Sequence, residues 1–215
     1  MGVYYVGYTN NGIYYCDESK DREKERVKYK EKGENFCSAP KHPAPKKILL
    51  ECGNHPEDAI FEIDGGRVEE HQFFVLDSVL VDTTCLFRPI VKIEFSSIIY
   101  LDAETEKHCG DNIDARPFGQ KELEADLLFE LIRICDGQKE CVQSWRYLKR
   151  FEIEGDDRLE VEFSEPFTVT FCDKVCPGCC EYKMVVSGRE FEGDFDSLRV
   201  VKPDLSALAQ GLCDD

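Results

Sequence analysis

The stretch that most constrains the fold of this chain is residues 76–100, which read LDSVLVDTTCLFRPIVKIEFSSIIY. Valine and threonine occupy every second position in residues 79–83, and valine, isoleucine and phenylalanine do so in residues 91–95. A period of two with β-branched and aromatic residues is typical of strands and not of helices. Arg88-Pro89 separates the runs, and proline biases its predecessor away from the helical region. The stretch therefore predicts two strands, joined as a β-hairpin or at a corner of a sheet.

The rest of the chain continues this pattern of short apolar runs divided by turn residues. Residues 123–135 fit both a helix face and a strand, and the turn signal Asp136-Gly137 favours a strand for residues 128–135. Repeated βαβ units are absent, which disfavours a doubly wound sheet. The pattern predicts an all-β fold, an antiparallel β-sandwich of the jelly-roll-like kind with an extended N-terminal arm. The remaining strands are expected at residues 48–52, 59–63, 142–153, 159–171, 182–187 and 197–201.

The N-terminal part differs from the rest in composition. Residues 1–16 are aromatic around a Thr-Asn-Asn-Gly turn signal, which fits a small hairpin or a segment that adds a strand to another sheet. Residues 17–34 are mostly charged with both signs, and residues 38–47 contain three prolines, as in a solvated segment followed by a semi-extended linker. The predicted organisation is an arm and linker at residues 1–45, a β-sandwich domain at residues 46–201, and a C-terminal tail at residues 202–215.

The charge of the chain excludes two classes of partner. Its 44 acidic and 27 basic residues give a formal net charge of −17. This charge repels polyanions, so we expect no binding to nucleic acid or to anionic lipid. No apolar run approaches the eighteen or so residues that span a membrane, so no membrane partner is expected. The N-terminal residues lack a basic segment followed by an apolar one, which predicts synthesis without a secretory signal.

Twelve cysteines are many for a chain of 215 residues, and the densest group lies between residues 172 and 180. Such density is typical of disulfides, metal binding or cross-links between chains. Cys176 and Cys179 form a CxxC pair, but the chain has no second pair of this kind to complete a common zinc site. Disulfides and zinc therefore both remain open. In the alternative interpretation, the chain is a β-sandwich binding module with a structural zinc site, whose ligands would be Cys172, Cys176, Cys179 and Cys180.

No set of residues predicts catalysis. The histidines at positions 42, 55, 71 and 108 are scattered, and nothing pairs them with a nucleophile. Among so many carboxylates, a chosen acid–base pair carries no information. Asp82-Thr83-Thr84 is expected to end a strand through hydrogen bonds from side chain to backbone. We therefore expect no enzyme, no catalytic residues and no cofactor.

Two motifs give the chain a resemblance to a known family. They are VDTTCLFRP at residues 81–89 and CPGCC at residues 176–180, within a similarity that covers about residues 46–201. The chain resembles a family of short proteins from spore-forming clostridia that is described as a domain of unknown function. It more distantly resembles the subunits of bacterial endospore appendages. Those are cysteine-bearing jelly rolls, made in the mother cell without a signal peptide, whose N-terminal connector inserts into earlier subunits.

This resemblance implies a structural subunit of a spore-surface or extracellular fibre, joined by strand donation from the arm and by intermolecular disulfides. Its partners would be other copies of the chain and other spore-surface proteins. It would be made in the cytoplasm and reach the spore surface or the exterior after lysis of the mother cell. Cys52, Cys85 and Cys135 lie within apolar runs and are expected to be buried free thiols. The expected cross-linking residues are Cys16, Cys37, Cys109, Cys172, Cys176, Cys179, Cys180 and Cys213.

Overall fold

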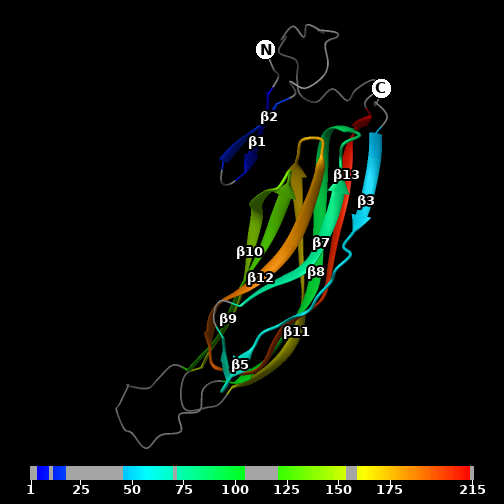
Figure 1. Cartoon of the computed structure of the whole chain (residues 1–215). Helices are drawn as coiled ribbons and strands as arrows, with labels where there is room; N and C mark the ends of the chain where they lie inside the picture. The colour runs from blue at the N-terminus through cyan, green and yellow to red at the C-terminus, as the bar shows by residue number, and fades with distance from the viewer. Residues whose placement is uncertain are drawn as a thin grey trace, which may run out of the picture.

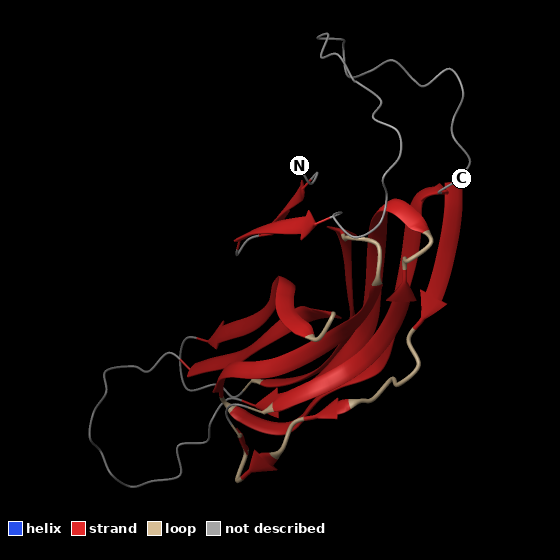
Figure 2. Ribbon diagram, turned by 45° about the horizontal axis from the view of Figure 1, so that its top comes forward, coloured by secondary structure: helices blue, strands red, loops and turns tan. Residues whose placement is uncertain are grey.

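The computed structural model describes residues 4–9, 12–17, 46–69, 72–104, 121–153 and 159–213. Within these ranges every regular element is a β-strand (Figure 2). No helix in the described ranges has the length and apolar character needed to cross a membrane. β1 (Tyr4–Thr9) and β2 (Gly12–Asp17) form an antiparallel hairpin, which was one of the two structures predicted for the N-terminal segment. The predicted charged segment and most of the proline linker lie outside the described residues.

Eight long strands form two antiparallel sheets that face each other (Figures 1 and 2). The four-stranded sheet has the order β10-β9-β12-β7, and the longer path of the other sheet has the order β11-β8-β13-β3. The strands of the first are β7 (Phe73–Asp82), β9 (Lys121–Cys135), β10 (Gln138–Ile153) and β12 (Cys179–Glu192). Those of the second are β3 (Lys46–Cys52), β8 (Leu86–Glu104), β11 (Glu160–Lys174) and β13 (Asp194–Cys213).

The connectivity is that of a jelly roll. If the eight long strands are counted from β3 to β13 in chain order, the two sheets read 1-8-3-6 and 2-7-4-5. This is the strand order of the double-sheet jelly roll, which confirms the predicted all-β sandwich. The shorter strands lie between β3 and β7. They are β4 (Ala59–Ile60), which pairs with β13, and β5 (Ile63–Asp64), which pairs with β6 (Arg67–Val68).

Of the two connections expected in residues 76–100, the hairpin is wrong. Its two strands are β7 and β8, which belong to opposite sheets, so the connection at residues 83–85 passes from one sheet to the other. The predicted turn at Arg88-Pro89 lies inside β8, where Arg88 has a φ of 52°. The partner strand β13 has a register shift between Gln210 and Leu212 beside this point. A proline is tolerated within a strand at such an irregularity. The hydrogen-bond ladder is already interrupted there, so the N–H that proline lacks is not missed.

The predicted C-terminal tail is also wrong in extent, because residues 202–213 belong to β13. The sequence Lys202-Pro203 reads as the end of a strand, but the structure has a register shift between Val201 and Asp204, with φ of 53° at Lys202. Pairing with β8 then resumes, and pairing with β3 begins beyond it. Leu205, a residue of this second half, is fully buried. The sandwich therefore extends beyond residue 201.

The core between the sheets is built by side chains that point alternately to the inner and outer faces of the strands. The ambiguous residues 123–135 are strand throughout, because the leucines four positions apart that suggested a helix face also satisfy a period of two. Phe129 of β9 and Phe167 of β11 stack across the interior with ring centroids 4.1 Å apart, and Phe95 of β8 packs against both. The predicted turn at Asp136-Gly137 is confirmed. Both residues have positive φ, as in the turns that join two-residue hairpins.

Candidate cross-linking site

The cysteines of the sandwich gather at one end, which we call the cysteine end. Here β7, β9, β11 and β13 end, and β3, β8, β10 and β12 begin, near the label C in Figure 1. Nine cysteines lie in the described part of the sandwich, and all except Cys52 are within four residues of a strand terminus at this end. The arm joins the sandwich at Lys46, the first residue of β3, which is also at this end.

The two motifs that carry the family resemblance meet at the cysteine end. Thr83 follows β7, and Gly178 precedes β12, which pairs with β7. The Thr83 N–H and its Oγ1 hydroxyl both donate to the Gly178 carbonyl, at 2.7 and 2.9 Å. The Gly178 N–H donates to Thr83 Oγ1 at 3.2 Å. Thr83 is fully buried, and its hydroxyl satisfies both backbone groups of the half-buried Gly178.

Asp82 shapes the connection that follows β7. Its Oδ1 accepts from the Thr84 N–H at 3.0 Å and from the Thr84 hydroxyl at 2.7 Å, which confirms the predicted strand ending. These hydrogen bonds favour the ionised carboxylate and lower the pKa of Asp82. The next residue, Cys85, is exposed, and Lys47 Nζ donates to its Sγ at 2.9 Å.

Cys135 and Cys180 form a disulfide across neighbouring strands of the four-stranded sheet. They are register partners on β9 and β12 with Cα atoms 4.4 Å apart, the spacing of a directly opposed, non-hydrogen-bonded pair. The prediction that Cys135 is a free thiol is therefore wrong, because strand register brings it to a cysteine 45 residues away in the sequence. Cys180 was expected to link chains and is bonded within its own chain. Cys176 is also disulfide-bonded.

Five described cysteines are free thiols, and they differ in exposure. Cys85, Cys172 and Cys179 are exposed at the cysteine end, while Cys141 is half-buried there. Burial, with a smaller effect of Glu130, raises the pKa of the Cys141 thiol to about 11.

Cys52 is also exposed, so the prediction that Cys52 and Cys85 are buried is wrong. Cys52 ends the edge strand β3, and Cys85 lies in the connection between the sheets, so neither is covered by a neighbouring strand on both sides.

The zinc set of the alternative interpretation is not formed in this structure. Zinc requires thiolates, and both Cys176 and Cys180 are oxidised to disulfides. The free members, Cys172 and Cys179, lie on β11 and β12 in different sheets. Among the other expected cross-linking residues, Cys37 and Cys109 lie outside the described residues. At Cys16 and Cys213 only the backbone is described.

A partly buried ionic network lies next to the disulfide, and the sequence did not reveal it. Arg133 Nη1 donates to Asp173 Oδ2 at 2.7 Å, and its Nη2 donates to Glu140 Oε2 at 2.7 Å. The fully buried Tyr182 donates its hydroxyl to the same Asp173 oxygen at 3.0 Å. Burial and the Asp173 charge raise the pKa of Tyr182, so the phenol stays protonated. This network joins the two sheets. Its only sequence signal was an arginine within the apolar run LLFELIRIC.

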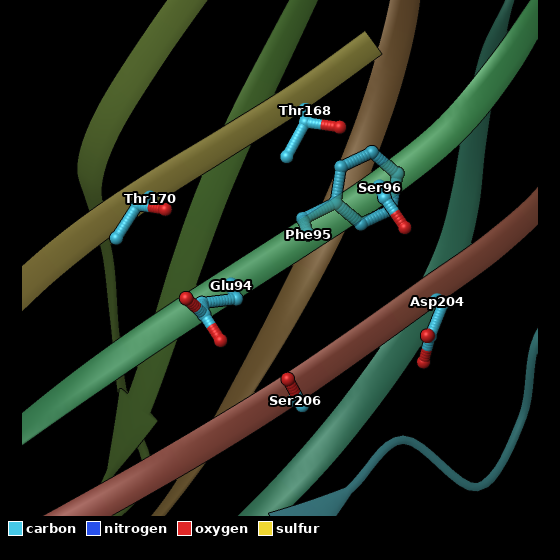
Figure 3. Close-up of a pocket in the computed structure, with 7 residues that line it drawn as sticks. All are labelled: Glu94, Phe95, Ser96, Thr168, Thr170, Asp204 and Ser206. Carbon is cyan, nitrogen blue, oxygen red and sulfur yellow. The ribbon is translucent and has the colours of Figure 1, made fainter. Parts of the chain in front are cut away.

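A shallow groove of about 310 Å³ lies on the five-stranded sheet and is lined almost entirely by oxygen-bearing side chains (Figure 3). None of its lining residues was expected from the sequence to belong to a site, and none is a histidine, cysteine or basic residue that would pair with the hydroxyls as in nucleophilic catalysis. Phe95 contributes little surface because its ring is buried in the core. The lining residues are Glu94, Phe95 and Ser96 of β8, Thr168 and Thr170 of β11, and Asp204 and Ser206 of β13.

No curated protein matches the chain. One similar solved structure is "Structure of infectious bursal disease virus Gx strain", with 8% sequence identity and a TM-score of 0.33. The alignment covers 98% of this chain and 37% of that one, so this chain spans little more than a third of the viral protein, and a similarity this weak carries no argument. Residues 46–210 match a sequence family over most of the chain. The chain belongs to the family described as Domain of unknown function (DUF4489).

Proposed function

We propose that this protein is a structural subunit that assembles with copies of itself, and that disulfides formed at the cysteine end link the subunits covalently. The observation that carries the proposal is the exposure of three free thiols, Cys85, Cys172 and Cys179, at one end of a complete sandwich. The sandwich has its own closed core, so these thiols are not needed to hold the domain together. Two such thiols on neighbouring subunits form one disulfide when an oxidant such as dioxygen accepts two electrons and two protons.

The arm supplies the second contact between subunits in this proposal. Within the described strands β3 pairs only with β13, so its other edge is open. Ile48 and Leu50 of β3 are 60% and 66% exposed, which is unusual for large apolar residues on a strand. A strand from a neighbour's arm, such as β1 or β2, would pair with this edge through main-chain hydrogen bonds and cover both side chains. Contacts of this head-to-tail kind that do not close into a ring produce a filament.

The setting proposed for this assembly is the spore surface or another extracellular appendage. It is supported by the resemblance to endospore appendage subunits and by the abundance of cysteines, which form lasting disulfides outside a reducing cytoplasm. The partners are copies of the same chain and other spore-surface proteins. The net charge of −17 opposes binding to nucleic acid or anionic membranes. We propose no catalytic activity and no cofactor.

Gel electrophoresis with and without reductant, combined with electron microscopy of the same sample, tests the covalent part. After air oxidation we expect a ladder of multimers that collapses to the monomer on reduction, together with fibres. The triple variant Cys85→Ser/Cys172→Ser/Cys179→Ser should lose most of the ladder, while Cys141→Ser, a half-buried thiol at the same end, should retain it. A single monomer band from the wild-type protein under both conditions would contradict the proposal.

A charge placed on the open edge tests the strand contact separately. Leu50→Lys puts an ammonium on β3, a substitution that natural edge strands use to prevent pairing. We expect it to remove the fibres while leaving the melting temperature of the reduced monomer within a few degrees of the wild type. Leu148→Lys is the matched control, because Leu148 is 42% exposed on β10, an edge strand of the other sheet. Equal loss of fibres in both variants would argue against β3 as the acceptor edge.

A further inference from the structure

Three carboxylates meet on the outer side of the four-stranded sheet, toward the end opposite the cysteine end. Glu124 and Asp126 belong to β9, and Glu190 belongs to β12. One oxygen from each lies within 4.8 Å of the others. This group is independent of the cysteines and of the proposed assembly.

Strand register and a bulge place these side chains. Glu190 lies opposite Asp126 in the pairing of β12 with β9, directly after a register shift between Gly188 and Glu190. A bulge of this kind re-aims the side chains that follow it. Glu124 and Asp126 alternate with core residues of β9 and so project from the outer face. Their side chains are nevertheless only 2% and 3% exposed.

Arginines cover the two buried carboxylates without using all of their oxygens. Arg146 Nε donates to Asp126 Oδ1 at 2.9 Å, and Arg189 Nε is 4.0 Å from Asp126 Oδ2. Arg150 donates from both Nε and Nη2 to a single oxygen, Glu124 Oε2. All three arginine side chains are about half exposed, at 49–52%. Their guanidinium groups can therefore move into solvent while the carboxylates stay fixed on the sheet.

The remaining oxygen, Glu124 Oε1, is the observation that points to a ligand. It is buried and has no hydrogen-bond partner. A buried acceptor without a partner is costly, and more so when it belongs to a charged group. The carboxylate that carries it is also the one that shares the cluster with Asp126 and Glu190. A cation bound among the three carboxylates would supply the missing interaction.

We propose that Glu124, Asp126 and Glu190 form a binding site for a calcium ion. All three ligands are carboxylate oxygens, which hard divalent cations prefer, whereas zinc favours nitrogen and sulfur. Ca²⁺ binds oxygens at about 2.4 Å, so two of its ligands lie at most about 4.8 Å apart, and the spacing of the cluster meets this limit. Ca²⁺ also accepts irregular geometry and completes its shell with water, while Mg²⁺ demands a near-ideal octahedron. The ion would tie β12 to β9 where the bulge interrupts their ladder.

Glu190 gives the sharpest test, because it is exposed and its substitution leaves the buried pairs with Arg146 and Arg150 in place. The full chain, kept reduced so that no disulfide links subunits, is melted with millimolar CaCl₂, MgCl₂, or NaCl of equal ionic strength. We expect Ca²⁺ to raise the melting temperature by several degrees over NaCl, and Mg²⁺ to raise it less. Calorimetric titration with CaCl₂ should show one saturable site, and Glu190→Gln should weaken it at least about tenfold.

The matched control is Glu160→Gln, an exposed carboxylate on β11 of the other sheet. A chain with a charge of −17 attracts Ca²⁺ non-specifically, and both substitutions reduce this attraction equally. If Ca²⁺ stabilises the wild type and Glu160→Gln but much less Glu190→Gln, the site is supported. If the two variants respond alike, or if Ca²⁺ acts no differently from NaCl, the proposal is overturned.

Discussion

Asp77 Oδ2 accepts a hydrogen bond of 3.1 Å from the backbone N–H of Leu205, which lies 128 residues further along the chain. Asp77 is on β7 and Leu205 is on β13, so this bond crosses from one sheet to the other. The second oxygen, Oδ1, accepts from the N–H groups of His55 and Ser78 at 3.1 and 2.7 Å. Asp77 is only 2% exposed. One buried carboxylate therefore satisfies three backbone donors and fixes β7 against β13.

Replacing this carboxylate is expected to destabilise the sandwich. Asp77→Asn removes the charge and leaves an amide nitrogen facing one of the N–H donors, at an expected cost of about 2–4 kcal/mol, since hydrogen bonds to charged groups contribute about 1.5–3 kcal/mol each. Urea unfolding of the reduced protein measures the effect. Asp64→Asn, on the exposed side of β5, is the control and should change stability by less than about 0.5 kcal/mol. A cost below about 1 kcal/mol at Asp77 would show that the backbone donors find other partners.

Position 53 requires glycine because its backbone lies close to the Asp77 carboxylate. Its N–H donates to the Leu205 carbonyl at 2.6 Å, and a Cβ at this position would lie 1.9 Å from Asp77 Oδ2. Gly53→Ala must therefore displace Asp77 and should cost about 2–3 kcal/mol, typical of an overpacked site. Gly178→Ala is the matched control, because the nearest atom to its Cβ would be 4.0 Å away. Thermal unfolding of both variants provides the comparison, and equal melting temperatures would refute the steric argument.

The Thr83 hydroxyl is expected to hold the two motif segments together. Thr83→Val keeps the shape of the side chain but removes the donor to the Gly178 carbonyl and the acceptor for the Gly178 N–H. We expect a loss of about 1–3 kcal/mol, because the half-buried Gly178 N–H loses its partner, while the Gly178 carbonyl keeps the Thr83 N–H. The control is Thr168→Val, an exposed β11 position where the same exchange should be nearly neutral. Similar urea midpoints for the two variants would mean that Thr83 acts through packing alone.

The sequence predicted the local structure well because the period of two is set by neighbouring residues, as in β9 and β11. It failed where a strand continues through an irregularity. Pro89 and Lys202-Pro203 carry turn signals, but each sits beside a register shift that keeps the strand in its sheet. Tertiary pairing overrides the local preference at both places.

The candidate site was predicted only in part for the same reason. The clustering of cysteines in the motif CPGCC was visible, but the disulfide between Cys135 and Cys180 depends on the register of β12 against β9. The acidic cluster around Glu124 depends on that register too, and on the bulge after Gly188 that sets Glu190 opposite Asp126. Residues brought together by strand order carry no short-range signal, because period and spacing describe only one strand at a time.

Stability should fall at acid pH partly through Glu165. Lys149 Nζ donates to Glu165 Oε2 at 2.9 Å and Tyr147 donates to Oε1, and these contacts lower the pKa of Glu165, with Lys149 the larger cause. A depressed pKa in the folded state contributes stability that is present above the unfolded value of 4.5 and is lost as pH falls through the folded value.

The substitution Glu165→Gln isolates this contribution. It should destabilise the protein by at most about 1 kcal/mol at pH 6, because the pair is partly exposed. The difference from wild type should shrink toward pH 3. Denaturant unfolding at the two pH values measures it, with Glu160→Gln as an exposed control. If the difference in unfolding free energy between wild type and Glu165→Gln grows on acidification, the pKa of Glu165 is not lowered in the folded state.

Cys141 should be the least reactive of the free thiols at the cysteine end. Its pKa of about 11 leaves about one molecule in a thousand as thiolate at pH 8, and only the thiolate is nucleophilic. We expect iodoacetamide to label the exposed Cys85, Cys172 and Cys179 well before Cys141, as followed by mass spectrometry of peptides from the folded chain. The rate at Cys141 should rise about tenfold per pH unit from pH 8 to 10. Labelling of Cys141 as fast as Cys172 at pH 8 would remove the basis for this order. Because the Cys141 thiol reacts slowly, its replacement by serine should leave cross-linking between subunits intact.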